Sequence, residues 1–121
     1  MAKKILVVDD AMFMRRMLTD ILKKAGYEVV AEASNGMEAL KMYKEHEPDL
    51  VTMDITMPEY TGIEGVKMIR EEYPNALVVM VSAMGQENMV VESVQAGAKG
   101  FIVKPFQADK VVDTIVKLIG N

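Results

Sequence analysis

Short, nearly continuous apolar runs alternate along this chain with stretches in which apolar residues recur at helical spacing. Strands that are buried on both faces of a parallel sheet have this near-continuous content of Val, Ile and Leu. The runs begin at similar intervals, and there are five of them: KILVV from residue 4, EVVAEA from 28, LVTM from 50, ALVVMV from 76 and GFIVK from 100. The pattern therefore predicts five buried parallel strands.

The intervals between these runs have the spacing of amphipathic helices. In the first interval Met14, Leu18, Ile21 and Ala25 share one face of the predicted helix. Strands that alternate with helices predict one α/β domain over residues 1–121, a doubly wound sheet of five β–α units with a flavodoxin-like fold. Alternation alone leaves the strand order open, and we expect 2-1-3-4-5 because it is the commonest order for five units.

In the fourth helical interval we expect the valines to face the core. Val91 and Val94 have suitable spacing for that face, and Met89 is then rotated outward to solvent.

The composition narrows the class of protein. The chain of 121 residues is 50% hydrophobic and 26% charged, which is ordinary for one soluble globular domain. It has no Cys, so disulfides and thiolate metal ligands are excluded. Lys and Arg are scattered and the net charge is −4, so we expect no nucleic-acid partner. No apolar run approaches a membrane span and the start lacks a signal peptide, so we expect a cytoplasmic protein that does not bind membranes.

Polar side chains follow four of the predicted strands at the point where each strand ends. They are Asp9 and Asp10 after the first strand, Asp54 after the third, Ser82 after the fourth and Lys104 after the fifth. Ligands of doubly wound sheets bind outside these carboxyl ends, so the five side chains are expected to converge on one crevice. Asp10 and Ser82 could each simply cap the helix that follows. Asp54 has no such role, because the next helical pattern begins near Thr61.

Three clustered carboxylates require compensating charge. Two unit charges ~4 Å apart repel by about 4 kcal/mol at an effective dielectric constant of about 20. Lys104 offsets part of this repulsion, and Mg²⁺ suits a site of oxygen ligands that supplies few protein groups. The chain has neither G-x-x-x-x-G-K-[ST] nor G-x-G-x-x-G, so we expect no bound nucleotide. We interpret Asp54 as a nucleophile that carries a phosphoryl group, which Lys104 and the Ser82 hydroxyl contact.

Four motifs together resemble one known family. VVDD, VTMDITMPEYTG, VSAMG and FIVKPF are similar, in order and spacing, to the receiver domains of two-component response regulators. The resemblance covers the whole chain, residues 1–121. The stretches DDAMFMRRML, SAMGQ and KPFQ resemble single-domain chemotaxis regulators of the CheY type most.

The resemblance implies a role for each matching residue. Asp54 would be the phosphoacceptor and Lys104 would pair with the phosphoryl group. Mg²⁺ would be bound by the carboxylates of Asp10 and Asp54 and by the Thr56 backbone carbonyl, with Asp9 acting mainly through water. A cis Lys104–Pro105 peptide bond is common in the family, and the sequence permits one.

The resemblance also implies a two-state switch. Ser82 would move toward the phosphoryl group and let Phe101 turn inward, and Met89 beside Phe101 becomes a candidate partner surface. Many chemotaxis regulators carry Tyr in place of Phe101, so a hydroxyl-dependent part of the switch is absent here. Thr56 and Met84 stand at positions that modulate phosphoryl hydrolysis and offer no acid or amide, which leaves the lifetime of the phosphorylated state open.

The implied partners are proteins. The phosphodonor would be a sensor histidine kinase of the CheA kind, and the target a flagellar or archaellar motor component or an adaptor. After KPF only one helix is predicted, so we expect no effector domain and a monomeric protein that acts through protein contact.

Three alternatives stay open at this stage. A phosphorelay intermediate would pass the phosphoryl group to a histidine phosphotransfer protein with the same chemistry. A haloacid-dehalogenase-like phosphatase needs a second Asp two residues after the nucleophile, where this chain has Thr56. A degenerate receiver that acts as an unphosphorylated scaffold is disfavoured because all five site residues are present. We therefore expect a phosphoacceptor that assists its own phosphorylation rather than an enzyme.

Overall fold

A parallel five-stranded sheet forms the centre of the computed structural model, which describes residues 2–57, 60–83 and 86–120. Within these ranges the strands and helices alternate in the order β1 (Lys4–Val8), α1 (Met12–Lys24), β2 (Glu28–Ala33), α2 (Gly36–His46), β3 (Leu50–Asp54), α3 (Gly62–Glu72), β4 (Val78–Ser82), α4 (Glu87–Gln95), β5 (Gly100–Val103) and α5 (Ala108–Ile119). The strand order is β2-β1-β3-β4-β5. The predicted doubly wound, flavodoxin-like fold and its strand order are confirmed.

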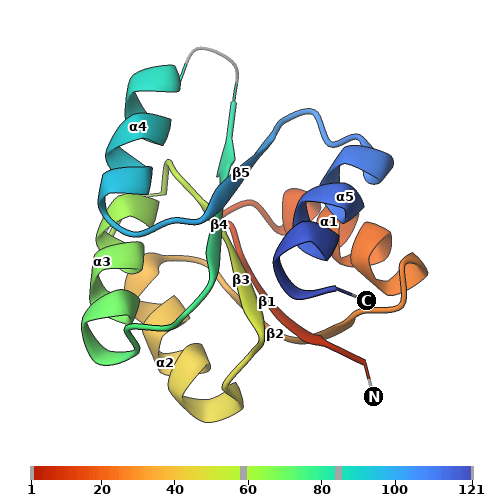
Figure 1. The fold of residues 1–121 in the computed structure, drawn as a ribbon, viewed down its shortest axis with the longest axis horizontal. Helices are drawn as coiled ribbons and strands as arrows, with labels where there is room; N and C mark the ends of the chain where they lie inside the picture. Colours follow the sequence, from red (N-terminus) through yellow and green to blue (C-terminus); the bar gives the residue numbers. More distant parts are fainter. Residues whose placement is uncertain (1, 58–59, 84–85, 121) are drawn as a thin grey trace.

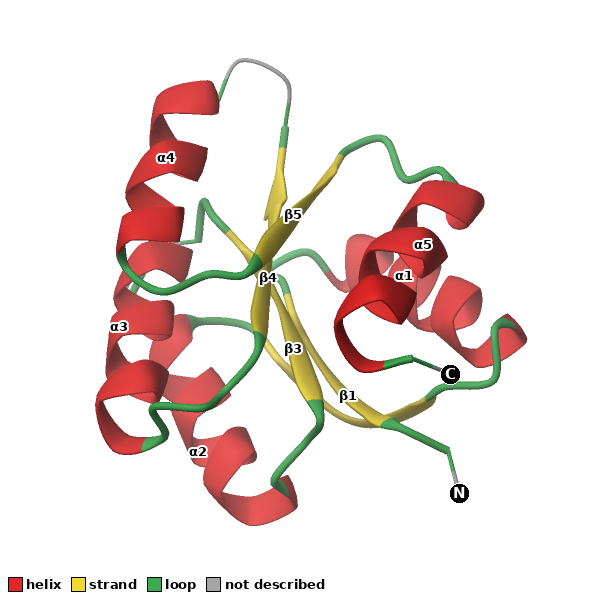
Figure 2. Cartoon of the chain, in the orientation of Figure 1, coloured by secondary structure: helices red, strands yellow, loops and turns green. Residues whose placement is uncertain are grey.

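Helices cover both faces of the sheet (Figures 1 and 2). Helices α2, α3 and α4 lie on one face, and α1 and α5 lie on the other. Successive strand residues alternate between the two cores: Val51 and Met53 of β3 pack toward α2, α3 and α4, whereas Leu50 packs toward α1 and α5. Both faces are therefore apolar, which explains the near-continuous Val, Ile and Leu runs.

The buried face of α4 differs from the prediction. Val91 and Val94 are 59% and 52% exposed, whereas Met89 and Val90 are partly buried against the core. Ser93 is fully buried in their place, and its hydroxyl donates a hydrogen bond to the Met89 carbonyl at 2.7 Å. Because this bond satisfies the hydroxyl inside the helix, a serine can occupy the core position and the valines turn to solvent.

Two further features complete the fold. The Lys104–Pro105 peptide bond is cis. None of the helices in the described part of the chain has the length and apolar character that a bilayer span requires.

Candidate functional site

Three carboxylates gather at the carboxyl ends of β1 and β3. Asp9, Asp10 and Asp54 each offer an oxygen, and these oxygens all lie within 4.8 Å of one another. Strands β1 and β3 are neighbours with Val8 opposite Met53, so the residues that end the two strands must come together. Asp9 and Asp54 are buried, whereas Asp10 is exposed and leaves the cluster open on one side. The predicted convergence of these acids is confirmed.

Lys104 reaches the same cluster from the loop after β5. Its Nζ lies 3.1 Å from Oδ2 of Asp9 and 3.4 Å from Oδ1 of Asp54. Burial lowers the pKa of Lys104, but the charges of Asp54 and Asp9 outweigh burial and the net pKa is raised. The ammonium is therefore firmly charged and holds the two buried carboxylates together.

The ionised form of Asp54 remains unfavourable although Lys104 lies beside it. Burial and then the charge of Asp9 raise the pKa of Asp54 to about 6, although Lys104 acts in the opposite direction. The positive charge of Lys104 is thus too little to offset the burial of Asp54 and its repulsion by Asp9. An all-carboxylate oxygen set with a charge deficit and one exposed member fits a hard divalent cation such as Mg²⁺.

The raised pKa of Asp54 predicts how stability without metal changes with pH. The folded pKa of about 6 lies above the ordinary value of 3.8, so ionised Asp54 destabilises the fold fully above pH 6 and this destabilisation disappears as the pH falls toward 3.8. At pH 7 in chelator, the free energy of unfolding of Asp54→Asn should therefore be about 1–3 kcal/mol higher than that of the unmutated chain, as measured by urea denaturation. The gain should shrink in acid. Asp20→Asn, at an exposed acid on α1, is the control, and equal effects of both variants would contradict this assignment.

Asp9 is held in place by bonds that the sequence does not reveal. Its Oδ1 accepts a hydrogen bond from the Ala11 N–H at 2.9 Å, and its carbonyl accepts one from Arg15 at 2.6 Å. Arg15 in turn donates to Glu32 at 2.9 Å. No motif marks Arg15, since its role depends on the first turn of α1 lying over the end of β1.

Ser82 and Phe101 lie where the strand pattern places them. Ser82 ends β4, is buried and accepts a hydrogen bond at its carbonyl from the Lys104 N–H at 2.8 Å. Phe101 on β5 is 50% exposed. The predicted outward orientation of Met89 is wrong, because this side chain is partly buried against the core. Its role in a partner surface stays a prediction. Thr56 is exposed two residues beyond Asp54, and its carbonyl as a metal ligand stays a prediction.

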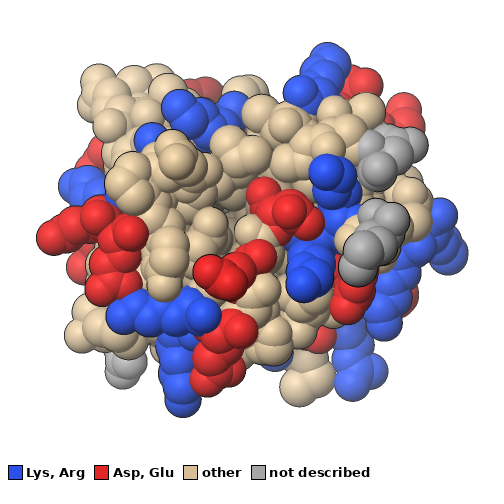
Figure 3. Space-filling model, turned by 60° about the horizontal axis from the view of Figure 1, so that its bottom comes forward, with Lys and Arg blue, Asp and Glu red and all other residues tan. Residues whose placement is uncertain are grey.

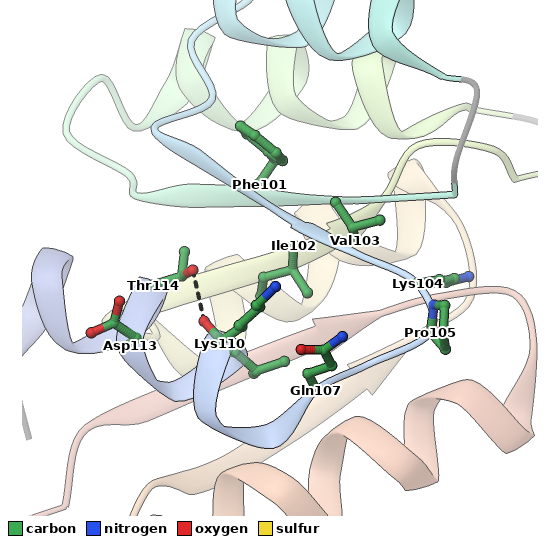
Figure 4. A pocket seen from close by; sticks show the side chains of 10 residues that line it. Phe101, Ile102, Val103, Lys104, Pro105, Gln107, Lys110, Asp113 and Thr114 are labelled. Carbon is green, nitrogen blue, oxygen red and sulfur yellow. Dashed lines mark hydrogen bonds between the residues drawn. The ribbon is translucent and has the colours of Figure 1, made fainter.

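A groove of about 550 Å³ runs between β5 and α5 (Figure 4). Phe101, Val103 and Lys104 line it from the strand side, and Lys110 and Thr114 line it from α5. The carboxylate cluster is not part of its lining, so Lys104 borders both the cluster and the groove.

Charges of both signs are mixed on one face of the molecule (Figure 3). On the face that Figure 3 shows, the described Lys and Arg side chains are interspersed with Asp and Glu. This face therefore has no continuous basic surface of the kind that binds nucleic acid.

Glycine is required where α3 begins beside the end of β3. The Gly62 N–H donates to the Ile55 carbonyl at 3.0 Å. A Cβ on Gly62 would overlap the Asp54 carbonyl oxygen and would lie 2.9 Å from the Ile55 Cα. The motif that contains Gly62 therefore lets α3 pack directly on the backbone of Asp54.

Comparisons with known proteins agree on one family. The family model described as the response regulator receiver domain matches residues 5–116. The chain is 60% identical over 119 residues to the chemotaxis protein CheY of Bacillus subtilis, covering 98% of this chain and 99% of that protein. It is 58% identical over 118 residues to CheY of Thermotoga maritima, covering 98% of each.

A solved structure gives the same result. The crystal structure of the CheX–CheY–BeF3–Mg complex from Borrelia burgdorferi matches with a TM-score of 0.90 and 40% identity. The match covers 95% of this chain and 87% of that chain.

Proposed function

The chain belongs to the response regulator receiver family, and from this premise we propose that Asp54 accepts a phosphoryl group and thereby changes the protein's affinity for a downstream partner. Its similarity to CheY proteins makes it a response regulator of the chemotaxis type. The observation that carries the phosphoacceptor assignment is the position of Asp54, buried among carboxylates with Lys104 Nζ 3.4 Å from its Oδ1.

The proposed reaction is a transfer between two side chains. A carboxylate oxygen of Asp54 attacks the phosphorus of a phosphohistidine, the O–P bond forms, and the P–N bond breaks with its electron pair going to the histidine nitrogen. A pKa of about 6 leaves Asp54 mostly ionised at pH 7, as the nucleophile must be. Lys104 is already beside the attacking carboxylate and can contact a phosphoryl oxygen.

Mg²⁺ fits the acidic cluster. Asp9, Asp10, Asp54 and the Thr56 carbonyl would hold it, with Asp9 acting mainly through water. When bound, the ion supplies positive charge that stabilises the anionic oxygens of the transferring group.

Bound Mg²⁺ should stabilise the folded protein. Because the ion binds the folded carboxylate cluster and not the unfolded chain, millimolar Mg²⁺ should raise the melting temperature by about 2–5 °C. Asp10→Ala should cancel the shift, since it removes the exposed ligand. Asp20→Asn should retain it. An unmutated protein whose melting temperature does not respond to Mg²⁺ would contradict the metal site.

The proposed output is a switch that proteins recognise. Ser82 would move toward the phosphoryl group, and Phe101, half-exposed on β5, would turn inward. The phosphodonor would be a sensor histidine kinase of the CheA kind, and the target a motor component or an adaptor. Phe101, Val103 and the β5–α5 groove form the apolar surface available for that target.

A phosphatase is the rival that can be tested directly. Such an enzyme needs a second acid two residues after the nucleophile, and Thr56 occupies that position with its hydroxyl accepting a hydrogen bond from Gln86 at 2.7 Å. The protein should take up one phosphoryl group from acetyl phosphate with Mg²⁺ and should not turn over p-nitrophenyl phosphate rapidly. Mass spectrometry and phosphate release measure the two outcomes. Rapid multiple turnover would overturn the proposal.

A further inference from the structure

Gln86 connects the two loops that flank Asp54. Its side-chain Oε1 accepts a hydrogen bond from the Ala83 N–H at 2.7 Å, and its Nε2 donates to the Thr56 Oγ1 at 2.7 Å. Ala83 directly follows Ser82 at the end of β4, and Thr56 lies two residues beyond Asp54 at the end of β3. These strands are neighbours with Asp54 opposite Val81, so one carboxamide links the residues that follow the two strands.

Gln86 also stands at the start of α4. It is the N-cap residue of this helix, and its carbonyl accepts the first helical hydrogen bond, from the Val90 N–H at 3.0 Å. Ala83 and the start of α4 are thus both linked to Thr56 through one side chain. Displacement of Ala83 relative to Thr56 therefore strains or breaks these bonds.

We propose that Gln86 is a positioning residue that holds Ala83 and the start of α4 against Thr56 and so weakens the response of the site to a phosphoryl group. The inference rests on the proposed function of Asp54.

The chemistry of the Ala83 N–H sets the direction of this effect. In the structure a neutral carboxamide oxygen accepts its hydrogen bond. Anionic phosphoryl oxygens accept hydrogen bonds about twice as strongly as neutral acceptors. A phosphoryl group on Asp54 therefore competes with Gln86 for donors near Ser82, and release of the carboxamide frees α4 from Thr56. Without Gln86 this competition is absent.

The test uses beryllofluoride, a stable stand-in for the phosphoryl group, titrated calorimetrically in excess Mg²⁺. Gln86→Ala should bind it about 3- to 10-fold more tightly than the unmutated chain, the factor that about one net hydrogen bond contributes to an equilibrium. Thr56→Val, which removes only the hydroxyl, should show a smaller gain. Thr56→Ser should restore the unmutated affinity.

A matched glutamine and a double variant separate positioning from general damage. Gln95→Ala changes an exposed glutamine on the same helix and should leave the affinity unchanged. The Gln86→Ala/Thr56→Val double variant should equal Gln86→Ala alone, because both changes break one shared bond. General damage to the site would weaken binding rather than tighten it.

The failures of the two proposals are distinguishable. If the unmutated chain takes up neither beryllofluoride nor a phosphoryl group, the proposed function and this inference are both overturned. If the unmutated chain binds beryllofluoride and Gln86→Ala binds it equally or more weakly, only the positioning role of Gln86 is overturned.

Discussion

Gly62→Ala should destabilise the protein strongly and reduce phosphoryl uptake, although Gly62 is no part of the reacting group. An added Cβ overlaps the Asp54 carbonyl oxygen and lies 2.9 Å from the Asp54 carbonyl carbon and the Ile55 Cα. All of these are backbone atoms, so no rotamer change relieves the overlap and either α3 or the end of β3 must shift. We expect a loss of about 2–4 kcal/mol in the free energy of unfolding.

Urea denaturation with a matched glycine variant tests this prediction. A Cβ on Gly100 would meet its nearest neighbour, the Thr114 Cγ2, at 3.6 Å, which is an ordinary contact. Gly100→Ala should therefore change stability by less than about 1 kcal/mol. Equal stability of the two variants would show that the start of α3 is not held against β3 as closely as the structure indicates.

The strands were predictable because a strand that is buried on both faces has a nearly continuous run of apolar residues. Leu50, Val51 and Met53 of β3 are all fully buried, and neighbouring residues contribute to opposite cores. The fold then follows from alternation. The site follows from the fold, because the carboxyl ends of neighbouring strands meet at one edge and bring Asp9 and Asp54 to Lys104.

Helix α4 was harder to predict because hydrophobicity and burial disagree there. The valine spacing favours Val91 and Val94 as the core face, yet the core accepts Ser93 because its hydroxyl bonds to the Met89 carbonyl. A serine whose hydroxyl bonds within its own helix can be buried, but a hydrophobicity pattern still counts it as a polar residue.

Long-range side-chain contacts around the site could not be predicted from the sequence either. Gln86 reaches Thr56 across 30 positions, and Arg15 reaches the Asp9 carbonyl from the helix that follows it. Neither residue belongs to the polar side chains at the strand ends from which the sequence predicts the site. The Gln86 contact becomes visible only when the ends of β3 and β4 are side by side, and the Arg15 contact only when α1 lies over the end of β1.

The central claim is that Asp54 is the phosphoacceptor, and Asp54→Asn should abolish phosphoryl uptake. An amide is a poor nucleophile, so the O–P bond cannot form, while the fold and the other carboxylates are retained. The variant should be at least as stable as the unmutated chain in chelator, because it loses a carboxylate whose pKa is raised by burial and by Asp9. Loss of uptake can then not be attributed to unfolding.

Intact-protein mass spectrometry after incubation with acetyl phosphate and Mg²⁺ tests this claim most directly. The unmutated chain and the Asp20→Asn control should each gain the mass of one phosphoryl group, and Asp54→Asn should gain none. A mass gain that persists in Asp54→Asn, or none in the unmutated chain, would contradict the assignment.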